Sequence, residues 1–284
     1  MEILSNKRLV IIQGVDVNGS SGYVKQMKSY GTNIVGVIVD DAQKRAGISG
    51  FSNVEAAVKE TKADTSVVFS NPENVKKDVL AAIEVGIDLI VIVTEKVPLQ
   101  DMIVLVAFAK QFGTRILGPG SAGLVVVDDM KLGIIPERIF EKGSVGIVCR
   151  SEILAYEVVQ RLTKNNIGQS VFVDLGADAV SGFRFDDVLP LFEDDKNTKV
   201  IVLIGEIGGV NEERAAMLAG KIKKPIVALI AGKSAPKGKK MGHAGAMICG
   251  VSGSYESKYA ALSKAGVKIA DNIIELVEIV ASLV

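Results

Sequence analysis

The sequence is poor in several residue types, and each shortage narrows what the chain can do. It has 284 residues with no tryptophan and one histidine, so a histidine-rich metal site cannot be built within this chain. Its two cysteines, Cys149 and Cys249, lie in apolar stretches without a Cys-x-x-Cys spacing. That arrangement favours buried free thiols in a reducing compartment over disulfides or metal ligands.

Charge and hydrophobic length exclude further classes. Lys plus Arg and Asp plus Glu both number 33, so the formal net charge is zero, whereas nucleic-acid-binding proteins are usually basic. No apolar stretch reaches the roughly 18 uncharged residues of a membrane-spanning helix. The N-terminus lacks the basic start and apolar core of a signal peptide. We therefore expect a cytoplasmic protein that binds neither nucleic acid nor membranes.

What the chain does contain is an alternation of short β-branched runs with helical segments. Strands that alternate with helices are typical of a parallel sheet covered by helices on both faces. The pattern restarts after a glycine-rich run at 118–123. We therefore predict an α/β protein of two doubly wound parallel-sheet domains, residues 1–122 and 123–284, with a connecting segment at 124–143. The predicted strands are 9–13, 34–39, 65–69, 89–93 and 115–117 in the first set and 144–148, 170–173, 200–204, 225–230 and 267–270 in the second.

The first glycine-rich loop follows the first predicted strand. Gly14, Gly19 and Gly22 do not have the Gly-x-Gly-x-x-Gly spacing of dinucleotide-binding proteins. A nicotinamide-dependent oxidoreductase is therefore disfavoured. A nucleotide-containing ligand and a plain tight turn both remain open for this loop.

The only histidine lies in the run 235–246, which reads Ala-Pro-Lys-Gly-Lys-Lys-Met-Gly-His-Ala-Gly-Ala. Flanking glycines leave the ring of His243 accessible and let backbone N–H groups approach a bound anion. An arbitrary lone histidine more often has a structural role, such as capping a loop. Here the loop follows a strand end and is unusually rich in glycine. The sequence therefore predicts that His243 is a catalytic nucleophile that carries a phosphoryl group.

Two other strand ends offer groups that suit this chemistry. Glu206 could accept the Nδ1 proton of the imidazole and leave Nε2 free to attack phosphorus. It could equally cap the helix that follows, and both roles can hold. Arg150 and Ser151 precede a predicted helix, whose first N–H groups and positive end would favour a bound phosphate.

Several motifs together carry a family resemblance over nearly the whole chain. The sequence resembles the α subunit of succinyl-CoA synthetase, in the nucleoside-diphosphate-forming acyl-CoA synthetase superfamily that also includes ATP-citrate lyase. The matching motifs are Val93-Thr94-Glu95, Gly118-Pro119, Arg150-Ser151 with Tyr156-Glu157, Gly205-Glu-Ile-Gly-Gly209, and the histidine run 235–246.

The resemblance implies a Rossmann-like CoA-binding domain followed by a flavodoxin-like ligase domain. It implies an acyl-CoA synthetase of the tricarboxylic acid cycle that acts on succinate through phosphorylated His243, oriented by Glu206. ATP or GTP with Mg²⁺ would be bound mainly by a separate ATP-grasp β subunit, and this chain would hold no metal of its own. The residues so implied are Ser151, Glu152, Ile153, Gly242, Ala244 and Gly245 for phosphate; Asp16, Val17, Asn18, Gly19, Lys44, Val93, Thr94 and Glu95 for CoA; and Tyr156, Gly120 and Ser121 for the carboxylic acid.

Departures from the family pattern cluster around the same sites. Glu152 replaces a glycine and adds negative charge at the helix end that would receive phosphate. The lysine that would pair with a CoA phosphate falls on Ala42, and an asparagine becomes Gly120. Either another carboxylic acid is the substrate, or CoA binding is weakened or recast. The alternative function is a CoA- or acyl-CoA-binding regulatory paralogue without turnover.

Overall fold

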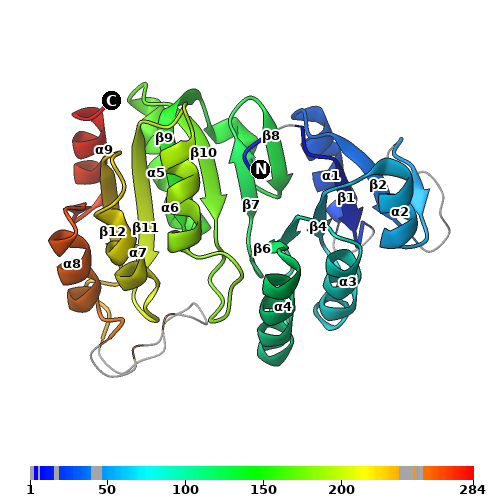
Figure 1. Cartoon of the computed structure of the whole chain (residues 1–284). Coiled ribbons are helices and arrows are strands. Elements are labelled where there is room, and N and C mark those ends of the chain that lie inside the picture. Colours follow the sequence, from blue (N-terminus) through cyan, green and yellow to red (C-terminus); the bar gives the residue numbers. More distant parts are fainter. Residues whose placement is uncertain are drawn as a thin grey trace. The chain divides into compact units, whose positions relative to one another are not determined.

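The structure, a computed structural model, describes residues 3–5, 7–15, 19–39, 47–236, 246, 248 and 252–284. Contacts divide the chain into two units (Figure 1). The first is Met1–Ile135 with Val180–Gly182, and the second is Pro136–Ala179 with Phe183–Val284. Every helix in the described ranges is too short or too polar to cross a membrane.

The first unit is built on a parallel sheet with the strand order β3-β2-β1-β4-β5-β6. Its central strands β1, β4 and β5 are buried along their whole length, as expected for strands covered on both faces. This is the Rossmann order, in which the order of the strands across the sheet reverses between β1 and β4. The strands are β1 Val10–Gln13, β2 Ile34–Ile38, β3 Gly50–Phe51, β4 Thr65–Val68, β5 Leu89–Ile92 and β6 Arg115–Leu117.

Helices cover both faces of this sheet. Asn53 starts α2 by accepting the N–H of Ala56 at 2.8 Å, and Pro72 occupies the first turn of α3, where its missing N–H costs nothing. Gly113 ends α4 with a φ of 74°. The helices are α1 Ser20–Ser29, α2 Val54–Thr61, α3 Pro72–Glu84 and α4 Leu99–Phe112.

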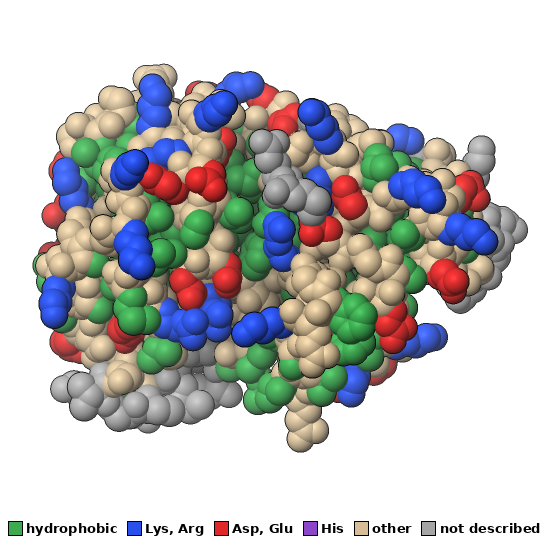
Figure 2. Space-filling view, viewed as in Figure 1, with side chains coloured by type: hydrophobic (Ala, Val, Ile, Leu, Met, Phe, Trp, Pro, Cys, Tyr) green, Lys and Arg blue, Asp and Glu red, His purple; other side chains and the backbone are tan. Residues whose placement is uncertain are grey.

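Helix α4 was not predicted from the sequence. It buries Met102, Leu105 and Ala109 against the sheet, but it also exposes Ile103 and Phe112. An element that is apolar on nearly every side shows no clear helical stripe. Figure 2 shows one face of the molecule, on which Lys and Arg side chains are interspersed with Asp and Glu side chains around patches of exposed hydrophobic residues.

The segment expected as a connection contains a hairpin, β7 Gly123–Val126 and β8 Met130–Gly133. Gly123 and Gly133 face each other so closely that a Cβ on Gly123 would lie 1.8 Å from the carbonyl oxygen of Leu132. The hairpin packs on α1, and the N–H of Lys131 donates to Thr32 Oγ1 at 3.1 Å. It belongs to the first unit by contacts, and the domain boundary between residues 122 and 123 stays a prediction.

The parallel strands of the second unit run in the order β13-β12-β11-β9-β10. This is the flavodoxin-like order, in which the order of the strands across the sheet reverses between β9 and β11. The two parallel sheets confirm the predicted fold class. The strands are β9 Lys142–Cys149, β10 Gln169–Asp174, β11 Val200–Glu206, β12 Ile226–Ala231 and β13 Lys268–Ala270.

The helices of the second unit form two layers, since α5 packs with α9 while α6, α7 and α8 pack with one another (Figure 1). Helix α6 was not predicted, because it contains Pro190. Asp187 closes its first turn by accepting the N–H of Arg184 at 2.9 Å. The helices are α5 Glu152–Lys164, α6 Phe185–Asp194, α7 Asn211–Ala219, α8 Tyr255–Lys264 and α9 Ile273–Ala281, and a 3₁₀ turn, η1, spans Glu137–Ile139.

Candidate active site

The strand reversal of the second unit brings two predicted site segments together. Strands β9 and β11 are neighbours, and Cys149 at the end of β9 pairs with Ile204 of β11. Glu206 ends β11, and the residue after β9 is Arg150. Ligands of open α/β sheets bind beyond the carboxyl ends of the strands at such a reversal. The site predicted from sequence therefore falls where this topology favours ligand binding.

Glu206 and Arg150 form a buried ion pair at this position. Both are almost completely buried, at 6% and 3% exposed, and Arg150 Nε lies 3.5 Å from Glu206 Oε1. Arg150 Nη2 also donates to the carbonyl oxygen of Asp178 at 3.1 Å. Sequence analysis considered Arg150 only as part of the turn before a helix. A charged residue directly after the apolar and buried end of a strand was the signal that it needs a buried partner.

Helix α5 begins beside this pair. Ser151 is its N-cap residue and makes no capping hydrogen bond with its side chain, and Glu152 is the first helical residue. The first N–H groups of a helix have no intrahelical partner and favour an anion. Ser151 and Glu152 are half-buried, whereas Ile153 is 75% exposed. Three of the six residues predicted for phosphate therefore lie together at the start of one helix.

Two residues near this turn are tied to the sheet rather than to the helix end. Tyr156 stacks on Phe172 of β10, with ring centroids 5.8 Å apart. Cys149 donates its thiol to Asp174 Oδ1 at 3.5 Å. Burial, followed by the charge of Asp174, raises the pKa of the Cys149 thiol well above its ordinary value. The thiol therefore stays protonated, which does not suit a nucleophile.

The predicted nucleophile His243, with Gly242, Ala244 and Gly245, lies outside the described residues. The described chain on either side of it is placed at the same sheet edge as Glu206. Ala231, at the end of β12, pairs with Glu206 in the sheet. After the histidine segment, the carbonyl oxygen of Gly253 accepts the N–H of Gly208 at 2.7 Å.

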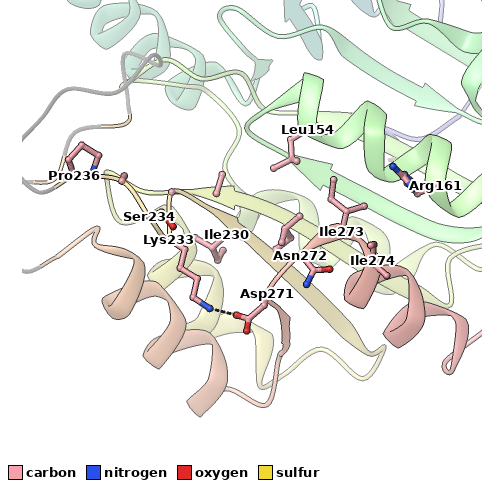
Figure 3. Close-up of a pocket in the computed structure, with 14 residues that line it drawn as sticks. Leu154, Arg161, Ile230, Lys233, Ser234, Pro236, Asp271, Asn272, Ile273 and Ile274 are labelled. Carbon is pink, nitrogen blue, oxygen red and sulfur yellow. Dashed lines mark hydrogen bonds and ion pairs between the residues drawn. The ribbon is translucent and has the colours of Figure 1, made fainter.

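A pocket of about 740 Å³ opens beside the end of β12 (Figure 3). Its wall includes Leu154 from α5 and Ile273 from the start of α9. At its edge Lys233 Nζ lies 2.6 Å from Asp271 Oδ1, but both side chains are more than half exposed, and such pairs contribute little to stability. The pocket therefore adds an aliphatic recess next to the α5 helix end.

The first unit has its own cleft at the reversal between β1 and β4. Gly14, directly after β1, has a φ of 72°, and a Cβ there would lie 2.4 Å from the backbone nitrogen of Ser70. A pocket of about 310 Å³ lies here, lined by both residues. Gly19 caps α1 with a φ of 74°, and a Cβ there would meet open space. The other predicted residues of this loop, Asp16, Val17 and Asn18, and Lys44 lie outside the described residues.

The remaining predicted CoA residues line a neighbouring pocket. Val93, Thr94 and Glu95 follow β5 and border a cavity of about 360 Å³ with Tyr23 and Phe69. Thr94 Oγ1 donates to the carbonyl oxygen of Ser70 at 2.7 Å, which ties the β5 end to the β4 end. The predicted CoA residues that are described therefore lie at the carboxyl edge of one sheet.

Two predicted substrate residues also belong to the first unit. Gly120 donates its N–H to the carbonyl oxygen of Thr94 at 2.9 Å. Ser121 is buried, and its Oγ accepts the N–H of Gly123 at 2.9 Å. Ser121 therefore shapes the turn after Pro119 through its side chain, and Gly120 lies beside the predicted CoA residues.

Comparison with known proteins first gives the class of protein. The family described as CoA binding domain matches residues 5–96, and the family described as CoA-ligase matches residues 148–268. A Rossmann-type unit followed by a flavodoxin-type unit with these matches defines a chain of the CoA-ligase class.

Individual relatives then give the family. The alpha 1 subunit of the ADP-forming succinate–CoA ligase of Archaeoglobus fulgidus is 40% identical over 271 residues, which are 95% of this chain and 93% of that protein. The alpha subunit from Aquifex aeolicus is 39% identical over 289 residues, covering 100% of this chain and 95% of that protein. The chain belongs to the family of succinate–CoA ligase α subunits, which confirms the resemblance seen in the sequence.

Solved structures share the fold at lower identity. The ATP citrate lyase of Methanothrix soehngenii, in complex with citrate and coenzyme A, matches 99% of this chain with a TM-score of 0.88 and 21% identity. An acetyl-coenzyme A synthetase of Ca. Korarchaeum cryptofilum matches 97% with a TM-score of 0.79 and 22% identity. This chain covers only 50% and 60% of those two chains.

Proposed function

We propose that this chain is the α subunit of an ADP- or GDP-forming acyl-CoA synthetase that works through phosphorylated His243. The buried carboxylate of Glu206 carries the proposal, because it lies at the strand reversal, beside β12, the strand that leads into the histidine segment. A carboxylate that is held in place can accept the Nδ1 proton of an imidazole and leave Nε2 free to attack phosphorus. Arg150 would hold that carboxylate in place.

The phosphoryl group would be stabilised by the first turn of α5. Ser151 caps this turn, and the first helical N–H groups, at Glu152 and Ile153, suit an anion, as do the backbone groups of the glycine-rich histidine run. Glu152 opposes this in part, since its carboxylate adds negative charge at the same helix end. The first turn of α5 would therefore offer backbone N–H groups to a phosphate, but the charge of Glu152 would weaken the positive electrostatic potential there.

The first unit would bind CoA. Gly14 lacks the Cβ that would meet the β4 end, so the backbone forms a cradle at the strand reversal. Gly19 starts α1, and the pocket around Val93, Thr94 and Glu95 extends the cleft along the sheet edge. Asp16, Val17, Asn18 and Lys44 are assigned to the same CoA site from the sequence resemblance.

The reaction would run in three balanced steps. His243 Nε2 takes the terminal phosphoryl group of the nucleoside triphosphate, and the diphosphate leaves. The phosphoryl group then passes to the carboxylate of the acid, which gives an acyl phosphate and free His243. The CoA thiolate attacks the acyl carbon, and inorganic phosphate leaves. Tyr156, Gly120 and Ser121 would position the acid, and succinate is the acid that the names of the relatives support.

The nucleotide and Mg²⁺ would be bound by a separate β subunit with an ATP-grasp domain. The names of the relatives, which call each an alpha subunit, support such a partner. Bound Mg²⁺ would neutralise the charge of the nucleotide phosphates. This chain would supply the nucleophile, the helix end and the CoA cleft.

Phosphorylation tests the proposal directly. The chain is co-expressed with its β subunit and incubated with Mg-ATP or Mg-GTP labelled in the terminal phosphate, and acid-labile label on His243 is measured. We expect label on the native complex, none on His243→Asn, and slower labelling of Glu206→Gln. An active β subunit that leaves His243 unlabelled would refute the proposed relay.

Glu152 favours one alternative, a regulatory paralogue that binds CoA or acyl-CoA without turnover. The two functions differ in what His243→Asn does. The alternative predicts CoA binding unaffected by that substitution and no exchange activity with any carboxylic acid. Label on His243 that is released as inorganic phosphate when a carboxylic acid and CoA are added, with formation of acyl-CoA, would exclude it.

A further inference from the structure

Lys258, on α8, is the cation of a buried ionic cluster at the carboxyl edge of the second sheet. Its side chain and that of Glu212 on α7 are both 0% exposed, and Lys258 Nζ contacts Glu212 Oε2 directly. Lys258 Nζ also lies 3.3 Å from Glu213 Oε2 and 3.3 Å from the carbonyl oxygen of Gly209. A lysine ammonium has three donors, and these three acceptors fix its orientation.

Glu212 and Glu213 each use their second oxygen on a different segment. Glu212 Oε1 accepts the backbone N–H of Glu206 at 3.0 Å. Glu213 Oε1 accepts the N–H of Gly253, which follows the histidine segment, at 3.0 Å. The cluster therefore joins the backbone of Glu206 to the chain that leaves the histidine segment.

The glycines around the cluster are explained by the same contacts. A Cβ on Gly205 would lie 2.6 Å from Glu212 Oε1. A Cβ on Gly253 would lie 2.5 Å from the carbonyl oxygen of Gly209, and Gly253 has a φ of 80°. Both positions therefore require glycine for the two segments to approach as closely as they do.

Stability alone does not account for a buried ion pair here. Well-packed apolar residues of similar volume are often as stabilising as a buried pair, because desolvating two charges offsets most of their attraction. The charges instead restrict the arrangement of the side chains, because an ammonium with three acceptors and a carboxylate that uses both oxygens allow few orientations. Glu212, which Lys258 holds, reaches Glu206 through the backbone N–H of that residue. Their effect on the site is through the backbone.

We propose that Lys258 and Glu212 are positioning residues for phosphoryl transfer, whose buried pair, together with Glu213, sets the backbone of Glu206 relative to Gly253, in the chain that follows the histidine segment. The proposal rests on the proposed function, because it assigns the pair to the phosphohistidine site. Small displacements of reacting groups are costly, and a shift of about 1 Å can slow a reaction about 100-fold.

The test uses the full chain in complex with its β subunit. Lys258→Met alone would leave Glu212 charged and buried, so the main variant is the double replacement Lys258→Met with Glu212→Gln, which removes both charges and keeps both volumes. The matched control is Lys264→Met, an exposed lysine at the end of the same helix. Labelling of His243 by Mg-nucleotide, the nucleotide KM, and CoA binding are measured for each.

We expect the double variant to label His243 about 100-fold more slowly at saturating nucleotide, with the nucleotide KM and CoA binding unchanged. A merely structural role would lower all three together, or none. Native labelling rates in the folded double variant would overturn the proposal. If the double variant does not fold, Glu212→Gln alone should also label His243 more slowly than the native complex, by a smaller factor. A native labelling rate in Glu212→Gln would overturn the proposal.

A failure of the proposed function itself gives a different result. In that case the native complex does not label His243 at all, and amide hydrogen exchange then tests the cluster. The amides of Glu206 and Gly253 should exchange faster in the double variant than in the native chain, while the Lys264→Met control matches the native chain. Unchanged exchange at both amides would overturn the positioning role.

Discussion

The buried pair of Arg150 and Glu206 gives the sharpest quantitative prediction. The two side chains are 4% and 7% exposed, so solvent screens them little. Arg150→Met leaves a buried carboxylate without its cation, and breaking such a pair typically costs about 3–5 kcal/mol. It also removes the hydrogen bond to the carbonyl oxygen of Asp178. With a urea dependence of about 1–3 kcal/mol per M, the unfolding midpoint of the second unit should fall by roughly 1–5 M.

The assay must separate the two units and cannot use tryptophan fluorescence, since the chain contains no tryptophan. Hydrogen exchange of β9 and β11 peptides in increasing urea reports the second unit alone. Glu206→Gln and the double variant Arg150→Met with Glu206→Gln complete a double-mutant cycle. Because the double variant contains no unpaired buried charge, its cost should be smaller than the sum of the two single costs by about 2 kcal/mol.

Additivity of the two substitutions would refute this reasoning. Equal costs for the double variant and the sum would mean that Arg150 and Glu206 do not stabilise each other. Arg150→Lys is the matched control for charge, because it keeps a cation but loses the planar fork that reaches Asp178. We expect it to cost less than Arg150→Met.

Three further predictions follow from single positions. Because the pKa of the Cys149 thiol is raised above its ordinary 9.0, the unfolded chain loses this proton at lower pH than the folded chain, so the free energy of unfolding should fall as pH rises above 9.0. In a Cys249→Ser background, the Cys149 thiol of the folded chain should resist alkylation at pH 8. Fast alkylation would contradict this. Gly14→Ala should destabilise the first unit by more than about 1 kcal/mol, because of its positive φ and the 2.4 Å contact. Gly22→Ala, in α1 with open space around it, should cost nothing, and thermal melting compares the two. Glu152→Gln should tighten inhibition by inorganic phosphate in the complex by about 2- to 5-fold at low salt, since one charge at a helix end contributes about 0.3–1 kcal/mol; weaker inhibition would contradict that reading.

Local sequence pattern predicted much of the fold but missed particular elements. The β-branched runs correspond to the parallel strands of both sheets except β3, which has only two residues, because strands buried on both faces are mostly apolar. Helix α4 was missed because it exposes Ile103 and Phe112, and α6 because Pro190 interrupts its pattern. The hairpin β7–β8 was expected as a connection, since its two strands are short.

The candidate site shows the same division. Glu206 and Ser151 were predicted as site residues because each lies at or near the end of a predicted strand and before a predicted helix. Arg150 as the partner of Glu206 and Lys258 as the partner of Glu212 were missed. Lysine and arginine are rarely buried without a partner, so a sequence pattern predicts that they are exposed to solvent. The carboxylates that pair with Arg150 and Lys258 are also distant from them along the chain.

The sequence by itself determined that this is an α/β chain with glycine-rich strand ends, and its motifs determined the family. Those properties depend on residues close together along the chain: strand runs, helix starts and the glycines of single loops. Only the tertiary structure decided that β11 lies beside β9, which brings Glu206 to Arg150, and that α8 returns to α7, which brings Lys258 to Glu212. Pairing of parallel strands and packing of helices join segments far apart in sequence, and no local period encodes which segments will meet.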